Sequence, residues 1–536
     1  MTGYVVEEFT DTERAVLRPY VTNLDGPVFA LVNLPEVVKG ALFARYSRSP
    51  KSLRRLFLDE FVGDLDIRGD LNVDATVGVT RAAQLYSRVF VEYGDDSVAQ
   101  LGGVHLACEQ ASNVLTKVLE WGRLMSYLEQ STRYIAYDDR LGGRYRYHRD
   151  PDILRSPLGT RYVGDMDRVF DAYAELVPRL IAHHRERTPK DPSDSDFVYR
   201  QAVRAKAFDT ARGLLPAASL SNVGIYGTGQ AYEQLLLRMR NHPLPEARSY
   251  AAMILTELRK VIPSFLERVD QPERGEVWSQ YLADTAGATT ELAQRLFADV
   301  ERPNEAGEGV ELVDFDPDGE DKLLTAILYP VVDLPERVVE ERVRAMSAEE
   351  RMAVVRAYVG ERRNRRHRPG RALERTSYRF DILADYGAFR DLQRHRMLTI
   401  EWQRLTPDHG YVRPAAIDEA GVASTFDETM ERSAALHDAL AERFDAQAAY
   451  AVCLAYRVRF SMQLNARAAM HLLELRSSPQ GHPAYRRVAQ QMHRLIADKA
   501  GHHAVAEMMR YVDHSDETEL ERLEAERRAE QRRGGT

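Results

Sequence analysis

The sequence contains little cysteine and no excess of positive charge. Only two cysteines, Cys108 and Cys453, occur among 536 residues. A disulfide framework is therefore not indicated, and the reducing cytoplasm is the expected compartment. The formal net charge of -9 argues against a general nucleic-acid binder, because neutralising phosphates requires clustered positive charge. The arginine-rich run at residues 362–368 is a local exception. We interpret it mainly as a solvated helix end, with phosphate contact as the alternative.

Long apolar runs, nucleotide-binding loops and metal-ligand spacings are also missing. No run of about eighteen apolar residues predicts a membrane span. Residues 1–20 are acidic and lack an apolar core, so no secretory signal is expected. No Walker-type or Gly-x-Gly-x-x-Gly loop occurs. The histidine pairs at 183–184 and 502–503 lack the spacing of metal ligands, so no metal site is expected.

The remaining sequence is typical of a large soluble protein with more than one domain. Its 44% hydrophobic and 29% charged residues are ordinary values, and its length predicts two to four domains. A strand at 27–35 precedes a helix at 36–46, and a strand at 310–315 precedes a helix at 320–329. A mostly buried helix is predicted at 98–125, and a further helix at 429–461. The predicted divisions are an N-terminal arm (1–25), a first domain (26–300), a polar linker (301–309), a second domain (310–514) and a charged tail (515–536).

The two predicted domains share one plan. Each begins with the strand and helix described above, and each has a helix that leads into a polar segment, at 121–134 in the first and 394–404 in the second. Each later has a helix that ends in arginine, at 230–240 and 465–476. A short loop and another arginine-bearing helix follow in both, at 246–248 and 485–487. Four correspondences in the same order indicate a tandem duplication.

The polar segments resemble the flavin-dependent thymidylate synthase family. The family signature reads Arg-His-Arg-x-x-Ser, followed by x-Asn-Glu-x-Ser-x-Arg-Tyr. The second half has the first block, with Thr399 where the family has serine. The first half has the second block in register: Ser126, Glu129, Ser131, Arg133 and Tyr134. The family's later Asn-Ala-Arg and Ala-Arg-x-x-Leu-Pro motifs are similar to residues 465–467 and 211–216. The resemblance implies an α+β fold of two tandem domains, rich in helix and with small antiparallel sheets.

The resemblance also implies roles for individual residues. Those matching the family's FAD-binding positions, with one histidine a helical turn further on, are Arg394, His395, Arg396, Asn465, Arg467 and His471. Those matching the dUMP-binding positions are Glu129, Ser131, Arg133, Arg212 and Arg240, with Arg476 as the second-half counterpart. Ser131 and Arg133 take the predicted catalytic role, Ser131 as a hydrogen-bonding group and not as a nucleophile.

The reaction implied is methylation of dUMP to dTMP, with methylenetetrahydrofolate as the carbon donor and NADPH as the source of electrons. A cysteine nucleophile is disfavoured because neither cysteine has the polar, electropositive surroundings that lower a thiol pKa. In the flavin route, reduced FAD supplies hydride and the protein supplies positioning. Departures at Thr399, Glu401 and Arg404 leave two alternatives open. One is a diverged flavoprotein with another substrate, and the other is a non-catalytic nucleotide-binding homologue.

Each half alone lacks part of the pattern. The first half has Trp121-Gly122 and residues 229–231 where flavin contacts are expected, and the second has Arg404, Thr406 and Pro407 where substrate contacts are expected. Because the family acts as a homotetramer with shared sites, we predict a homodimer of this chain that mimics a tetramer. Ordinary structural roles compete with these assignments. Glu129 and Arg133 are spaced as a helix pair, Arg212 and Arg240 suit plain ion pairs, and His471 suits an apolar core.

Overall fold

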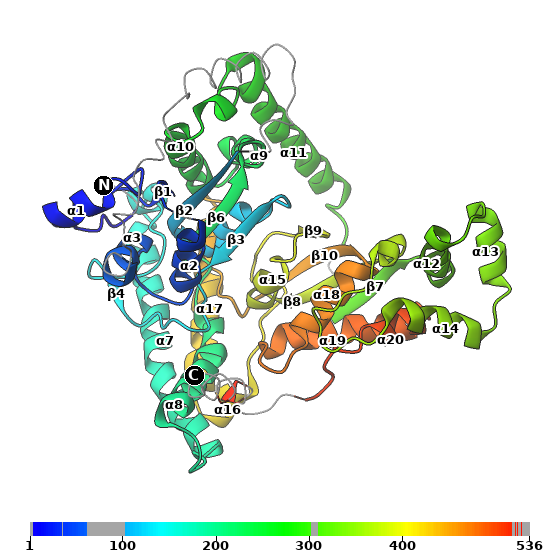
Figure 1. Cartoon of the computed structure of the whole chain (residues 1–536). Coiled ribbons are helices and arrows are strands. Elements are labelled where there is room, and N and C mark those ends of the chain that lie inside the picture. The colour runs from blue at the N-terminus through cyan, green and yellow to red at the C-terminus, as the bar shows by residue number, and fades with distance from the viewer. Residues whose placement is uncertain are drawn as a thin grey trace. The chain divides into compact units, whose positions relative to one another are not determined.

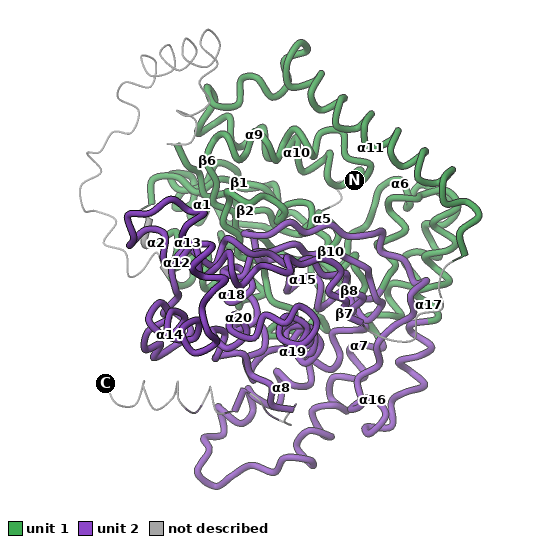
Figure 2. The backbone as a smooth tube through the Cα atoms, turned by 90° about the vertical axis from the view of Figure 1, so that its right-hand side faces the viewer, with its two compact units in different colours: residues 1–171, 216–304, 431–452 green, residues 172–215, 305–430, 453–536 purple. Residues whose placement is uncertain are grey.

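The computed structural model describes residues 4–34, 36–61, 102–301 and 309–516, with residues 520, 522, 523 and 527. Most of the predicted linker (301–309), and the first residues of the helix predicted at 98–125, lie outside them. The chain forms two compact units (Figure 2). Unit 1 comprises residues 1–171, 216–304 and 431–452, and unit 2 comprises residues 172–215, 305–430 and 453–536. Residues 172–215 of the first half thus belong to unit 2, and residues 431–452 of the second half to unit 1. The domain boundaries drawn from the sequence stay a prediction.

Unit 1 is built on a four-stranded antiparallel sheet of order β1-β2-β6-β3 (Figure 1). Its strands are β1 (Val28–Leu31), β2 (Gly103–Ser112), β3 (Met125–Glu129) and β6 (Leu220–Thr228). The strand predicted at 27–35 is confirmed. The helix predicted at 98–125 is wrong over β2, most of whose residues are buried on both faces of the sheet. Such a strand presents a nearly continuous apolar run, which periodicity does not separate from a buried helix.

Unit 2 contains a second four-stranded antiparallel sheet, of order β7-β8-β10-β9. Its strands are β7 (Gly309–Phe315), β8 (Ser377–Asp385), β9 (Thr399–Trp402) and β10 (Arg457–Asn465). The strand predicted at 310–315 is confirmed. The helix predicted at 429–461 is wrong over its second part. Helix α17 (Ala423–Ala441) ends at Ala441. A short 3-10 turn at Ala448–Ala451 follows, and β10 begins at Arg457.

Helices outnumber strands in the described parts of both units. The unit 1 helices used below are α5 (Asn113–Leu119), α9 (Gly229–Arg240), α10 (Pro245–Arg259) and α11 (Val277–Leu296). Those of unit 2 are α8 (Asp196–Ala211), α14 (Ala348–Val359), α15 (Tyr386–Leu392), α16 (Ala415–Glu419), α18 (Ala466–Arg476) and α19 (Pro483–Asp498). The boundary between the units falls within α7 (Gly159–Arg187). The predicted helix-rich α+β fold with antiparallel sheets is confirmed.

The two sheets continue into helices at equivalent points. In each, two strands run directly into a helix, as β2 into α5 and β6 into α9 in unit 1, and β8 into α15 and β10 into α18 in unit 2. The last residue of each strand caps the helix, because its side chain accepts a hydrogen bond from a backbone amide of the first turn. These caps are Ser112, Thr228, Asp385 and Asn465. The same strand-to-helix joints in the same order support the tandem duplication.

The C-terminal tail contacts α8 in unit 2. The tail residues Leu520 and Leu523 pack against Val198, Ala202 and Val203 of α8. The described part of the charged tail is therefore docked in unit 2. None of the helices in the described part of the chain combines the length and the apolar character that crossing a membrane requires.

Candidate functional site

A cluster of histidine and arginine side chains lies beside the loop that follows α15 in unit 2. Arg476, the last residue of α18, donates from Nε to Nε2 of His395, at 2.9 Å. The ring of His471, one turn earlier on α18, contacts the His395 ring edge-on, with 5.3 Å between centroids. Nη2 of Arg368 lies 3.0 Å from Nδ1 of His471. We call His395, His471, Arg476 and Arg368 the histidine–arginine cluster.

Both histidines of this cluster are held in the neutral form. Burial, together with the nearby charge of Arg476, lowers the pKa of His395 well below its usual range. Burial, followed by the charges of Arg368 and Arg365, lowers the pKa of His471 to about 4. His395 therefore accepts from Arg476 through Nε2 and keeps its proton on Nδ1. The cluster consequently presents neutral imidazoles beside permanent cations.

A carboxylate joins the cluster to Arg212. Asp391 lies in the last turn of α15, and its Oδ2 accepts from Nη1 of Arg212, at 3.2 Å. Its Oδ1 lies 3.9 Å from Nη1 of Arg476. The Arg212 side chain is buried, 4% exposed, so an ionic partner is needed to offset the loss of hydration. Although Arg212 comes from the first half of the sequence, it lies in unit 2 with Arg476.

The other predicted flavin residues surround the same part of unit 2. Arg394 and Arg396 are exposed on either side of His395. Asn465 caps α18, with its Oδ1 accepting from the amide of Ala468, at 2.9 Å. Arg467, in the first turn of α18, lies 3.4 Å from a carboxylate oxygen of Glu374. All six predicted flavin residues are thus on α18, on its cap or in the loop after α15.

Four predicted substrate residues belong to unit 1. The Glu129 side chain is fully buried at the end of β3, and its Oε2 lies 3.5 Å from Nζ of Lys117. Ser131 and Arg133 lie in the turn that follows, where the Arg133 amide donates to Oγ of Ser131, at 3.3 Å. The helix-pair interpretation of Glu129 and Arg133 is wrong, because β3 and a turn hold them. Arg240 ends α9 and forms an ion pair with Glu276, at 3.6 Å.

The basic run at 362–368 is mostly exposed, as expected, but it is not a helix end. It follows the end of α14 as irregular chain. Arg362 is 1% exposed and donates from both Nη atoms to the carboxylate of Glu474, at 2.6 Å each. Arg368, at the other end of the run, reaches His471. Arg362, the first residue of the run, therefore holds the run against α18. Arg368, its last residue, belongs to the histidine–arginine cluster.

Sequence reasoning missed Lys117 and Asp391, and it named Arg368 only as part of the basic run at 362–368. A signal existed for Asp391, because it stands one helical turn before Arg394 and so can lie on the same side of the chain. The contact of Arg368 with His471 carries no local signal, because the two residues are 103 positions apart. Lys117 is bonded to Glu120, three residues on, and also approaches Glu129. Among the described residues, no group of three or more histidine, cysteine, aspartate or glutamate side chains is placed to hold a metal ion.

The chain is similar to several known proteins. The model of the family described as thymidylate synthase complementing protein matches residues 54–264 and 312–502. A UPF0159 protein of Chlamydia muridarum (strain MoPn / Nigg) is 40% identical over 527 residues, covering 97% of this chain and 98% of the relative. One from Thermoplasma acidophilum is 32% identical over 527 residues, covering 93% and 99%.

A solved structure also matches. It is a UMP/dUMP methylase, PolB from Streptomyces cacaoi, bound with 5-Br dUMP, with 20% identity and a TM-score of 0.32. The match covers 39% of this chain and 99% of that one. In the chain itself, the first stretch matched by the family model contains β2, β3 and β6, and the second contains β8, β9 and β10. Each matched stretch therefore includes three strands of one sheet.

Proposed function

This chain belongs to the thymidylate synthase complementing protein family, with two consecutive matches, and from that premise we propose that it methylates C5 of dUMP, or of a closely related uracil nucleotide, using FAD. The observation that carries the proposal is the gathering of the six predicted flavin residues in one part of unit 2. Exposed arginines suit the pyrophosphate of such a cofactor, and neutral imidazoles suit its ring atoms. Bound FAD would supply the hydride in its reduced form.

The chain's own residues would bind and orient the nucleotide. Arg133, partly exposed in the turn after β3, suits bidentate contact with a phosphate. Ser131 beside it donates or accepts a hydrogen bond and holds the substrate in place. Arg476 polarises a pyrimidine carbonyl as negative charge develops there. In this proposal, Glu129 and Arg240 position the substrate-binding turn and helix.

The environment of the cysteines supports a route that uses no thiol nucleophile. Cys108 lies within β2 and Cys453 in the turn before β10, and both are fully buried. Burial raises the pKa of the Cys108 thiol, so the reactive thiolate is not formed at neutral pH. In the flavin route, methylenetetrahydrofolate provides the carbon and NADPH the electrons.

One observation favours a second candidate, a flavoprotein of the same family that acts on a different substrate. Asp391 already neutralises Arg212 and approaches Arg476. These two arginines were assigned to the anionic nucleotide, and a carboxylate between them repels another anion. A less charged substrate is compatible with this arrangement.

The test is an absorbance spectrum of the purified protein, followed by titration with dUMP. We expect flavin absorbance that changes on adding dUMP, and release of label from C5-tritiated dUMP that requires NADPH and methylenetetrahydrofolate. Bound flavin without release of label would favour the second candidate. Protein that contains no flavin and takes up none would contradict both.

We also propose that the chain works as a homodimer, because each copy of the duplicated unit lacks part of the family pattern. Light scattering on the flavin-loaded protein should give twice the chain mass of 61.0 kDa. A monomer of 61.0 kDa that binds flavin and turns over would contradict this assembly.

A further inference from the structure

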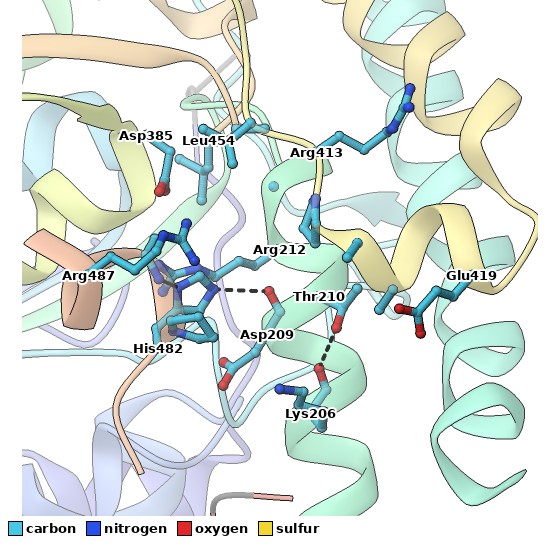
Figure 3. Close-up of a pocket in the computed structure, with 18 of the residues that line it drawn as sticks. Lys206, Asp209, Thr210, Arg212, Asp385, Arg413, Glu419, Leu454, His482 and Arg487 are labelled. Atoms are coloured by element: carbon cyan, nitrogen blue, oxygen red, sulfur yellow. Dashed lines mark hydrogen bonds between the residues drawn. The ribbon is translucent and has the colours of Figure 1, made fainter. Parts of the chain in front are cut away.

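Unit 2 contains a cavity of about 540 Å³, and Figure 3 shows Arg212, His482 and Arg487 on its wall. Arg212 is already assigned to the nucleotide, so this cavity belongs to the site proposed above. Helix α11 of unit 1 is a separate feature. It carries none of the predicted site residues, and it lies between the two stretches that the family model matches.

Helix α11 is fixed to unit 1 at its beginning. Glu276, directly before the helix, forms an ion pair with Arg240 at the end of α9, at 3.6 Å, and Ser279 in the first turn is buried. From residue 284 to the end of the helix, every residue is exposed. An isolated helical segment of fewer than about 15 residues is only marginally stable in water. The exposed part of α11 would therefore be stabilised by a packing partner.

The exposed apolar side chains of α11 form one stripe. Its large members, which are 44–61% exposed, are Val277, Trp278, Tyr281, Leu292 and Leu296. With about 100° of rotation per residue, all five lie within one sector about 100° wide. This is the width of the apolar face with which a helix packs against its neighbours. Thr285 and Ala288 lie in the same sector and are small, so another helix can approach closely at the middle of the stripe.

The stripe is complementary to a second copy of itself in the antiparallel orientation. With a two-fold axis between residues 288 and 289, Tyr281 of one copy lies opposite Leu296 of the other, and Leu292 lies opposite Thr285. A large side chain therefore meets a small one on both sides of the axis. A parallel pair would instead place each residue opposite its own copy, with Leu292 against Leu292 and Ala288 against Ala288.

The charges of α11 favour the same orientation. Asp284 and Arg295 are eleven residues apart, which is about three turns, so both lie on one flank of the stripe. In the antiparallel pair, Arg295 of one copy lies about 3 Å along the axis from the position opposite Asp284 of the other. The long arginine side chain spans this offset, and the two-fold axis gives two such ion pairs. A parallel pair would bring like charges together.

We propose that α11 is an interface between two copies of this chain, in which the two stripes pack antiparallel about a two-fold axis. The proposal rests on the homodimer proposed above and names the surface that forms it, and it uses no step of the proposed chemistry. One helix face per copy is small, so we expect a total interface near the lower end for specific complexes, about 1,200 Å². The dimer should accordingly dissociate on dilution.

The test is sedimentation equilibrium of the full chain over a range of concentrations. Leu292→Glu places a charge within the stripe and should weaken dimerisation at least about 10-fold, because that charge would be buried without a partner. Gln294→Glu is the matched control, since it adds a carboxylate to the same helix on the side away from the stripe. We expect its dimerisation constant to stay within about twofold of the wild-type value.

Charge reversal tests the orientation. Asp284→Arg and Arg295→Asp should each weaken dimerisation about 2–30-fold, the range for two exposed ion pairs. The double variant Asp284→Arg/Arg295→Asp should return to within about threefold of the wild-type value. Because the two residues are about 16 Å apart along one helix, restoration reports a contact between copies.

Flavin absorbance of the same samples separates this interface from the proposed chemistry. Dimerisation that is lost in Leu292→Glu and kept in Gln294→Glu supports the interface, whether or not flavin is bound. A dimer that Leu292→Glu leaves intact would overturn the α11 interface while the homodimer itself stands. A double variant no better than its single reversals would overturn the antiparallel pair. A wild-type chain that stays monomeric at every concentration would overturn both the interface and the homodimer.

Discussion

The sheets of unit 1 and unit 2 have the same strand order, but their equivalent loops carry different side chains. In unit 1, the loop between α5 and β3 contains Trp121, and Arg238 of α9 lies over its ring at 5.0 Å. In unit 2, the corresponding loop between α15 and β9 contains His395, and Arg476 of α18 donates to it. A helix arginine therefore meets a loop aromatic in both units. The indole nitrogen of Trp121 can only donate a hydrogen bond, whereas a neutral imidazole has one nitrogen that donates and one that accepts.

This difference indicates what a duplicated fold keeps and what it can lose. The caps and the strand register maintain the backbone in both copies, so the loop side chains are free to change. Unit 1 retains a polar turn at Ser131 and Arg133 but has an indole where unit 2 has imidazole. Unit 2 retains the histidines but has Glu401 and Arg404 where the family has substrate contacts. The proposed division of labour follows from these complementary losses.

The largest expected effect concerns buried ion pairs, which differ between the units. Glu474→Gln leaves Arg362 buried without its bidentate partner and should lower the free energy of unfolding by about 3–5 kcal/mol. Glu109→Gln in unit 1 should cost less. Arg54 makes a single contact with Glu109, at 3.3 Å, and burial already raises the pKa of that carboxyl. Urea unfolding followed by circular dichroism measures both.

The control for this comparison is a pair on the surface. Glu361 and Arg363 are 77% and 75% exposed, so Glu361→Gln should change stability by no more than about 0.5 kcal/mol. Equal losses for Glu474→Gln and Glu361→Gln would mean that the Arg362 pair does not anchor unit 2.

The next effect separates the proposed roles of the two units. Arg394→Ala should weaken flavin binding, and Arg133→Ala should weaken dUMP binding while flavin stays in place. Each loss should be about 10–150-fold, the range for a hydrogen bond to a charged group. Flavin absorbance and dUMP titration of each variant provide the two readouts. If both variants show the same defect, the units do not divide the ligands in this way.

The sequence predicted short amphipathic elements better than buried ones. The helices at 36–46 and 466–476 and the strand at 310–315 are flanked by proline, glycine or polar caps and match the structure closely. Strand β2 was taken for part of a helix, because most of its residues are buried on both faces of the sheet. Strand β10 alternates between polar and buried apolar residues, and the helix predicted at 429–461 was extended too far into it. Motif matching proposed Arg212 and Arg476 without showing that Asp391 lies between them. That contact, like Arg368 with His471, depends on long-range packing that no local pattern encodes.

A smaller effect is the pH dependence of unit 2. The pKa of His471 is about 4 in the folded protein, against 6.5 for an ordinary histidine. Between these values the unfolded chain binds more protons, so the free energy of unfolding decreases as pH falls from about 6.5 to 4. We expect His471 to contribute about 1–3 kcal/mol to this decrease, after allowance for its partial exposure. His471→Gln should flatten the curve by that amount, and an unchanged curve would contradict the neutral cluster.

The smallest effect tests the unit 1 counterpart of the cluster. Trp121 is 45% exposed, so the contact of Arg238 with its ring should be worth only about 0.5–1 kcal/mol. Arg238→Met keeps the aliphatic packing and should cost no more than this in urea unfolding, with a shift in Trp121 fluorescence. Arg476→Met on α18 removes the hydrogen bond to His395 and should cost more while raising the pKa of both histidines. If Arg238→Met instead weakened flavin binding, unit 1 would have kept a cofactor site. The two loops would then have the same function despite their different side chains.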